Sequence, residues 1–243
     1  MKTKNPIPNM ITLANLFAGI LSIYFGMLGD LKLAAYLIFI SALLDFMDGF
    51  AARLMNAYSD LGKQLDSLAD MVSFGVAPGF ILFNMMSISH GQPGNTGTSD
   101  TLIPFIGFMV PLFGALRLAK FNIDDSQEDS FIGMPIPAAA ILIASFPLIR
   151  ESLYQDRGLM YMVFTNTYFL IGSSVIISLL MVLPLPMFAF KFKSYGWKVN
   201  KIKYSFLIIS LILLISFQFI AIPIIISLYV LLSLVFYLTD MQS

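Results

Sequence analysis

Long uncharged runs dominate this sequence. No Asp, Glu, Lys or Arg occurs in residues 5–29, 158–190 or 204–239. Only 12% of the 243 residues are charged, about half the usual share in soluble domains, and the mean hydropathy is +0.85. A hydrocarbon core about 30 Å thick is crossed by roughly 20 apolar residues in a helix. Since lipid offers no partners to backbone amides, the chain is expected to be an all-α, polytopic membrane helix bundle.

About eight transmembrane helices are predicted from the positions of these runs. The last run has 36 residues, and as one helix it would be about 54 Å long, too long for one crossing. Two short spans that turn near Pro223 are therefore predicted there. The other six spans are expected near residues 9–28, 32–55, 64–89, 102–122, 137–149 and 167–187.

Basic residues predict the orientation in the membrane. With the N-terminus in the cytoplasm, eleven Lys and Arg residues lie at inner loops and ends and three lie outside. The net charge is zero, 14 basic against 14 acidic residues, so no nucleic-acid partner is expected. There is no Cys, which excludes a thiol nucleophile and a thiolate metal site.

Four aspartates lie at the predicted cytoplasmic ends of the second and third spans. Charged groups inside a membrane span are costly, so they indicate a functional site. Asp45 and Asp48 share one helix face, and Asp66 and Asp70 share another, by their spacing of three and four residues. The two helices are joined by a short loop, so the four carboxylates should converge. The small residues on these faces are Gly49, Ala52 and Gly62.

Such a cluster predicts divalent cations. Four carboxylates in a partly dry site need a counter-charge, and two hard cations with oxygen ligands supply it. Without Cys, and with the one His in a predicted outer loop, Mg²⁺ or Mn²⁺ is favoured over Zn²⁺. Two-metal carboxylate sites are typical of phosphoryl displacement, and Arg53 is suited to phosphate oxygens. A proton or ion relay in a cation-coupled transporter is the alternative, although all four acids lie at one membrane face.

The acidic segments also resemble a known signature. The run Asp45-x-x-Asp48-Gly49-x-x-Ala52-Arg53, then eight residues, then Gly62-x-x-x-Asp66-x-x-x-Asp70 is similar to that of the CDP-alcohol phosphatidyltransferases at every fixed position. The resemblance implies a six-helix core with two metals, a CDP-linked lipid donor, and transfer of its phosphatidyl group to an alcohol with release of CMP. It implies metal ligation by Asp45, Asp48, Asp66 and Asp70, with Asp70 also the general base, and a CDP site lined by Gly49, Ala52, Arg53 and Gly62.

Further expectations follow from this resemblance. Residues 1–190 would form the family core, and residues 191–243 a cytoplasmic basic loop plus a C-terminal two-helix hairpin. The protein would be a homodimer in a prokaryotic cytoplasmic membrane, with its active site facing the cytoplasm. The segment around Asn9 and Thr12 resembles the family's nucleotide-lining N-terminal segment; either residue could instead cap the first helix.

Two more segments bear on the acceptor alcohol. Residues 117–122 and 131–140 resemble those of membrane-integral phosphatidylserine synthases, which implies CDP-diacylglycerol and L-serine as substrates. Serine binding is then expected at Arg117, Lys120 and Asn122. Arg117 and Lys120 could instead be interfacial anchors that snorkel to the membrane surface. Glycerol 3-phosphate or an inositol phosphate is the alternative acceptor, for which a denser basic cluster would be expected.

Overall fold

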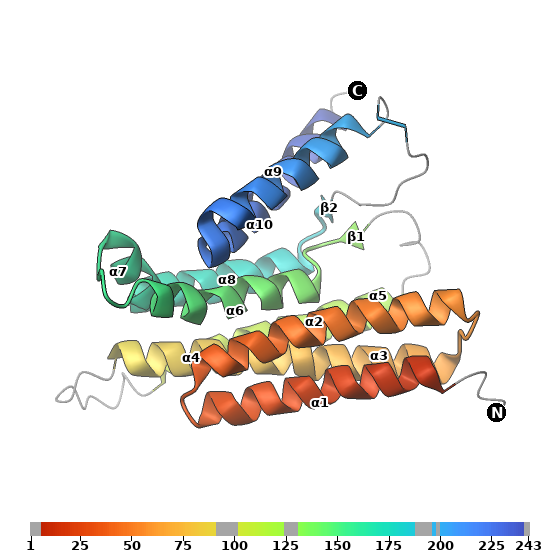
Figure 1. Ribbon diagram of the computed structural model, residues 1–243, viewed down its shortest axis with the longest axis horizontal. Helices are drawn as coiled ribbons and strands as arrows, with labels where there is room; N and C mark the ends of the chain where they lie inside the picture. The colour runs from red at the N-terminus through yellow and green to blue at the C-terminus, as the bar shows by residue number, and fades with distance from the viewer. Residues whose placement is uncertain (1–5, 91–101, 124–130, 188–195, 198–199, 241–243) are drawn as a thin grey trace.

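The computed structural model describes residues 6–90, 102–123, 131–187, 196–197 and 200–240. Its helices lie in layers along one long axis (Figure 1). The first part of the chain comprises α1 (Ile7–Met27), α2 (Leu31–Leu54), α3 (Asp60–Asp70), the π-helix η1 (Met71–Val76), α4 (Ala77–His90), the 3₁₀-helix η2 (Ile103–Phe108) and α5 (Met109–Ile123). The second comprises β1 (Phe131–Ile132), α6 (Ile136–Ser152), α7 (Leu159–Thr165), α8 (Thr167–Val182), β2 (Pro186–Met187), α9 (Lys201–Phe217), the 3₁₀-helix η4 (Gln218–Ile220) and α10 (Ala221–Asp240).

The predicted all-α membrane bundle is confirmed. The described chain has five helical stretches long and apolar enough to cross a membrane, or six if the bent pair α7–α8 forms one span. This count is lower than the predicted eight for two reasons. Helix α6 has only 17 residues, and residues 201–239, with α9 and α10, count as one stretch.

The C-terminal break does not lie at Pro223. Helix α9 ends at Phe217, and Gln218 has φ 49°, a backbone conformation that reverses the chain before α10 begins. Pro223 lies in the first turn of α10, where a missing N–H is tolerated. The two helices lie side by side (Figure 1). The predicted turn near Pro223 is therefore wrong by a few residues, because the chain turns at Gln218.

The connection between α2 and α3 sets the two acidic helix ends beside each other. Asn56 has φ 48° and reverses the chain after α2. Ser59 then caps α3, because its hydroxyl accepts a hydrogen bond from the Gly62 amide at 3.0 Å. The second and third spans are therefore antiparallel neighbours at this end.

A polar contact point joins three helices next to the acidic segments. The buried Asn15 carbonyl in α1 accepts hydrogen bonds from Ser41 of α2 at 3.2 Å and from Ser73 of η1 at 3.1 Å. Ser41 precedes Asp45 by one helical turn, and Ser73 follows Asp70 by three residues. Gly19 faces Ser73, and a side chain there would collide with the Ser73 backbone. The contact holds both acidic helices against α1.

Two elements were not predicted from the sequence: helix α7 and the antiparallel pair β1–β2. The strand pair begins a tight segment in which the Gly133 amide donates to Leu185 O at 2.8 Å and the Met134 amide to Leu180 O at 2.9 Å. Gly133 has φ +75°, which favours glycine. Figure 1 shows the strands between the layer of α6 and α8 and the layer of α9 and α10.

The hydrophobic core lies between α2, α4 and α6. Ile38, Ile81 and Ile143, one from each helix, are fully buried in it. Much of the expected cytoplasmic basic loop, including Lys191 and Lys193, falls outside the described residues. The division into residues 1–190 and 191–243 stays a prediction.

Candidate active site and metal centre

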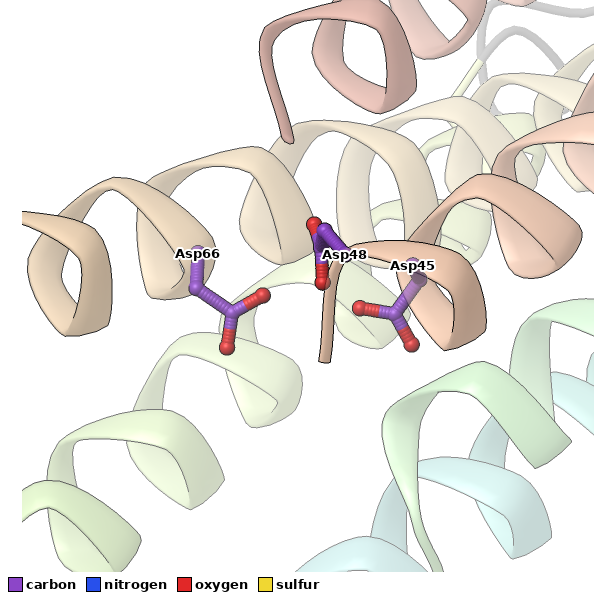
Figure 2. A group of neighbouring side chains, drawn as sticks. All are labelled: Asp45, Asp48 and Asp66. Atoms are coloured by element: carbon purple, nitrogen blue, oxygen red, sulfur yellow. The ribbon is translucent and has the colours of Figure 1, made fainter. Parts of the chain in front are cut away.

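Three carboxylates meet between α2 and α3. Asp45, Asp48 and Asp66 each offer one oxygen, and these atoms all lie within 4.8 Å of one another. Figure 2 shows their carboxyl groups turned toward a common space from the two helices. Asp48 is buried, with 6% of its surface exposed. The arrangement follows from helical spacing, which places one turn of each helix opposite the other.

The fourth aspartate lies against this group. The Asp70 carboxyl lies close to that of Asp45. Asp70 Oδ1 and Asp48 Oδ2 are buried and have no hydrogen-bond partner among the described residues. Buried carboxylate oxygens without partners are costly, whereas a hard cation satisfies several of them together. The site therefore fits divalent metal ions bound by oxygen ligands.

A large cavity opens beside the carboxylates. It has a volume of about 790 Å³ and is lined by residues of α1, of the end of α2, of the α2–α3 connection and of α3. Eight of the predicted site residues line it: Asn9, Thr12, Asp48, Gly49, Ala52, Arg53, Gly62 and Asp66. A Cβ on Gly62 would come within 3.1 Å of Asn9 Oδ1, so a side chain there would crowd the cavity wall. The cavity is large enough for a nucleotide-sized group.

A second, smaller cavity lies at the end of α5. Its volume is about 330 Å³, and among the described residues that line it, Arg117 and Lys120 are the charged ones. Phe121 lines both cavities and so forms a wall between them. Arg117 is 8% exposed, and its guanidinium interacts with the charge of Asp70. Arg117 is thus a buried cation in the wall of the second cavity.

The third residue predicted to bind serine is placed differently. Asn122 is not among the residues that line the second cavity. Its Nδ2 donates to Ser67 Oγ at 3.0 Å, next in sequence to Asp66. The observed contact of Asn122 ties the end of α5 to α3, the helix that carries Asp66.

Sequence reasoning missed several residues around the site. Ser41 and Ser73 stand at helical spacing from Asp45 and Asp70, and that spacing could have indicated that they support the same face. Phe121 follows Lys120 directly, but nothing in the sequence marks it as a shared wall.

Comparison with known proteins places the chain in a family. The sequence model of the CDP-alcohol phosphatidyltransferases matches residues 5–171, which include both acidic helices and all of α6. The chain is similar to proteins named CDP-diacylglycerol–serine O-phosphatidyltransferase from three organisms. The Bacillus subtilis protein is 42% identical over 148 residues, 58% of this chain and 76% of the relative. The Helicobacter pylori protein (strain 26695) is 35% identical over 173 residues, 69% of each chain.

The third relative is similar over a shorter stretch. The protein of Methanocaldococcus jannaschii is 40% identical over 140 residues, 58% of this chain and 62% of the relative. The family match covers more than half of the chain. Its range contains the carboxylate cluster and the described lining of the larger cavity, including all eight predicted residues. The chain therefore belongs to the CDP-alcohol phosphatidyltransferase family.

Proposed function

We propose that this protein transfers the phosphatidyl group of CDP-diacylglycerol to the hydroxyl of L-serine, which gives phosphatidylserine and CMP. The observation that carries the proposal is the pair of cavities that share Phe121, the larger beside the carboxylates and the smaller beside Arg117 and Lys120. A donor and an acceptor held in adjoining sites can react directly. The names of the similar proteins from three organisms support serine as the acceptor.

The larger cavity suits the CDP part of the donor. Gly49, Ala52 and Gly62 leave room for the nucleotide, and Arg53 offers a planar fork to phosphate oxygens. Asn9 and Thr12 add polar groups from α1. The exposed apolar side chains of the helices lie in the bilayer, from which the acyl chains of the donor reach the site.

We assign the four aspartates to two divalent cations, Mg²⁺ or Mn²⁺. Asp45, Asp48 and Asp66 would hold one ion, and Asp45, Asp66 and Asp70 the other. When bound, such ions neutralise charge on the phosphate oxygens in the transition state. The ligand set consists of oxygens, as these hard cations prefer.

Asp70 is also the general base of the proposed reaction. It removes the proton of the serine hydroxyl as that oxygen attacks the phosphatidyl phosphorus in line with the leaving group. The bond between this phosphorus and the CMP oxygen breaks, and CMP leaves with the electron pair. The chain has no Cys, and its one His ends α4, so a covalent phosphatidyl intermediate on either residue type is not part of the proposal.

Serine would bind in the smaller cavity. The Arg117 guanidinium would pair with its carboxylate, and Lys120 would add a second, weaker attraction. Asn122 would act through its bond to Ser67, by holding α5 against α3. Arg117 and Lys120 are the cations in the described part of the lining, and two cations suit one carboxylate better than the phosphate of glycerol 3-phosphate or an inositol phosphate.

The setting of the reaction follows from charge and family. We propose that the site faces the cytoplasm at a prokaryotic cytoplasmic membrane, and the bias of Lys and Arg supports this orientation. The homodimer is proposed from the family resemblance. The hairpin of α9 and α10 is proposed as an addition to the core of residues 1–190.

The test is an acceptor panel. Purified protein in detergent is supplied with Mn²⁺ or Mg²⁺, CDP-diacylglycerol and one labelled alcohol at a time, and both CMP and the lipid product are measured. The proposal predicts CMP release that depends on serine and on the metal. Release with glycerol 3-phosphate or an inositol phosphate, and not with serine, would contradict it. Ion flux in liposomes without CMP release would instead support the cation-coupled transporter.

A further inference from the structure

Phe121 marks the point where the proposed donor and acceptor cavities meet. Of the described residues that line the two cavities, Phe121 is the one common to both. The larger cavity also has Asp48 and Asp66 in its lining, and the smaller has Arg117 and Lys120. Phe121 is 36% exposed, so it presents apolar surface instead of packing fully into the core. The space between the proposed donor and acceptor is therefore bounded by a phenylalanine.

The backbone around Phe121 is fixed by contacts with neighbouring helices. Phe121 lies in the last turn of α5, which packs against η1 and α8. The next residue, Asn122, donates from Nδ2 to Ser67 Oγ of α3 at 3.0 Å. One turn earlier, Arg117 is buried. The position of Phe121 between the cavities is thus set by the bundle, and a change of its side chain alters the boundary without removing these contacts.

Water is a competitor in the proposed transfer. The larger cavity has polar groups in its lining, among them those of Asn9, Thr12 and Arg53, to which water hydrogen-bonds. When water attacks the phosphatidyl phosphorus, its oxygen bonds to phosphorus, the bond to the CMP oxygen breaks, and the proton passes to Asp70. The products are then phosphatidic acid and CMP. Transfer to serine therefore requires that water be excluded from the phosphorus.

We propose that Phe121 is a specificity-determining residue, whose ring excludes water from the junction of the two cavities and so directs the phosphatidyl group to serine. An aromatic ring fills this space with apolar surface, which water solvates unfavourably. Serine is not excluded, because Arg117 and Lys120 attract its carboxylate to the acceptor side. This inference rests on the proposed function, because it takes the two cavities as the donor and acceptor sites.

The variant Phe121→Ala tests this role through the ratio of two products. Purified protein receives Mn²⁺ or Mg²⁺, a fixed concentration of serine and CDP-diacylglycerol labelled in its acyl chains, and both lipid products are separated and counted. The ratio of phosphatidic acid to phosphatidylserine should rise about tenfold or more, the scale on which apolar pockets discriminate between substrates. Phe121→Leu, which removes less volume, should give a smaller rise. Phe17→Ala is the matched control, since Phe17 is 61% exposed and is not among the described lining residues of either cavity.

The two variants of Phe121 together separate this role from a packing defect. A folded variant in which both products fall by the same factor would show that Phe121 only supports the structure, and would overturn the proposal. An unchanged product ratio in both variants would overturn it as well. In either case serine transfer by the parent protein still stands, whereas a parent protein that forms no phosphatidylserine contradicts the proposed function itself. If Phe121→Ala does not fold, the ratio in Phe121→Leu decides.

Discussion

Replacing Arg117 with Ala should lower kcat/KM for serine and leave binding of CDP-diacylglycerol nearly unchanged. Only 8% of the Arg117 surface is exposed, so its bond to a substrate carboxylate is shielded from water. Losing a hydrogen bond to a charged group costs about 1.5–3 kcal/mol. That free energy corresponds to a decrease of roughly 10- to 150-fold in kcat/KM.

A conservative variant separates charge from geometry. Arg117→Lys keeps a cation beside Asp70 but cannot present two parallel donors, so it should recover only part of the loss. Lys120→Ala should reduce serine use in the same direction by a smaller factor, since Lys120 is the auxiliary cation of the cavity.

The assay is steady-state CMP release, first with serine varied at saturating CDP-diacylglycerol and then with CDP-diacylglycerol varied at saturating serine. Arg53→Ala serves as the matched control, because it lines the larger cavity and should raise KM for the lipid rather than for serine. If Arg117→Ala leaves the serine parameters unchanged and weakens lipid binding, Arg117 belongs to the donor site and the reasoning is refuted.

Three further predictions address the base, the cavity wall and the topology. Asp70→Asn should abolish turnover while CDP-diacylglycerol still binds, as measured by equilibrium binding; near-normal turnover would contradict its role as base. Gly133→Ala should strain a residue at φ +75° by about 1–3 kcal/mol, lower the unfolding temperature and raise KM for serine. Gly158→Ala, with open space at its Cβ, is the control, and equal behaviour of the two would contradict the strain. In this Cys-free chain, Gly158→Cys should react with an impermeant thiol reagent in intact cells and Lys201→Cys should not; the opposite labelling would invert the topology.

The carboxylate cluster could be predicted because its geometry is local. Asp45 and Asp48 share a face of α2, Asp66 and Asp70 share a face of α3, and a short connection brings the helix ends together. Helical spacing therefore determines most of the site before any packing is known. The span positions were equally predictable, since charged residues mark the ends of the apolar runs.

Packing around the site could not be predicted in the same way. Helices α9 and α10 are largely apolar, so no amphipathic pattern indicates which of their faces packs against α6 and β2. The π-helix after Asp70 contains Ser73, which donates to the Asn15 carbonyl of α1, and local sequence does not predict such a contact between distant helices. The predicted turn at Pro223 was wrong because proline also occurs in the first turn of a helix, where its missing N–H is tolerated.

The stereochemistry at phosphorus tests the central claim of a single direct transfer to serine. The substrate is CDP-diacylglycerol in which sulfur replaces one non-bridging oxygen of the phosphatidyl phosphate, with known configuration at phosphorus. It is converted with serine, and the configuration at phosphorus in the phosphatidylserine product is determined. One in-line attack, as the adjoining cavities and Asp70 predict, gives inversion at phosphorus. Retention would require two displacements through a covalent phosphatidyl-enzyme and would contradict the account.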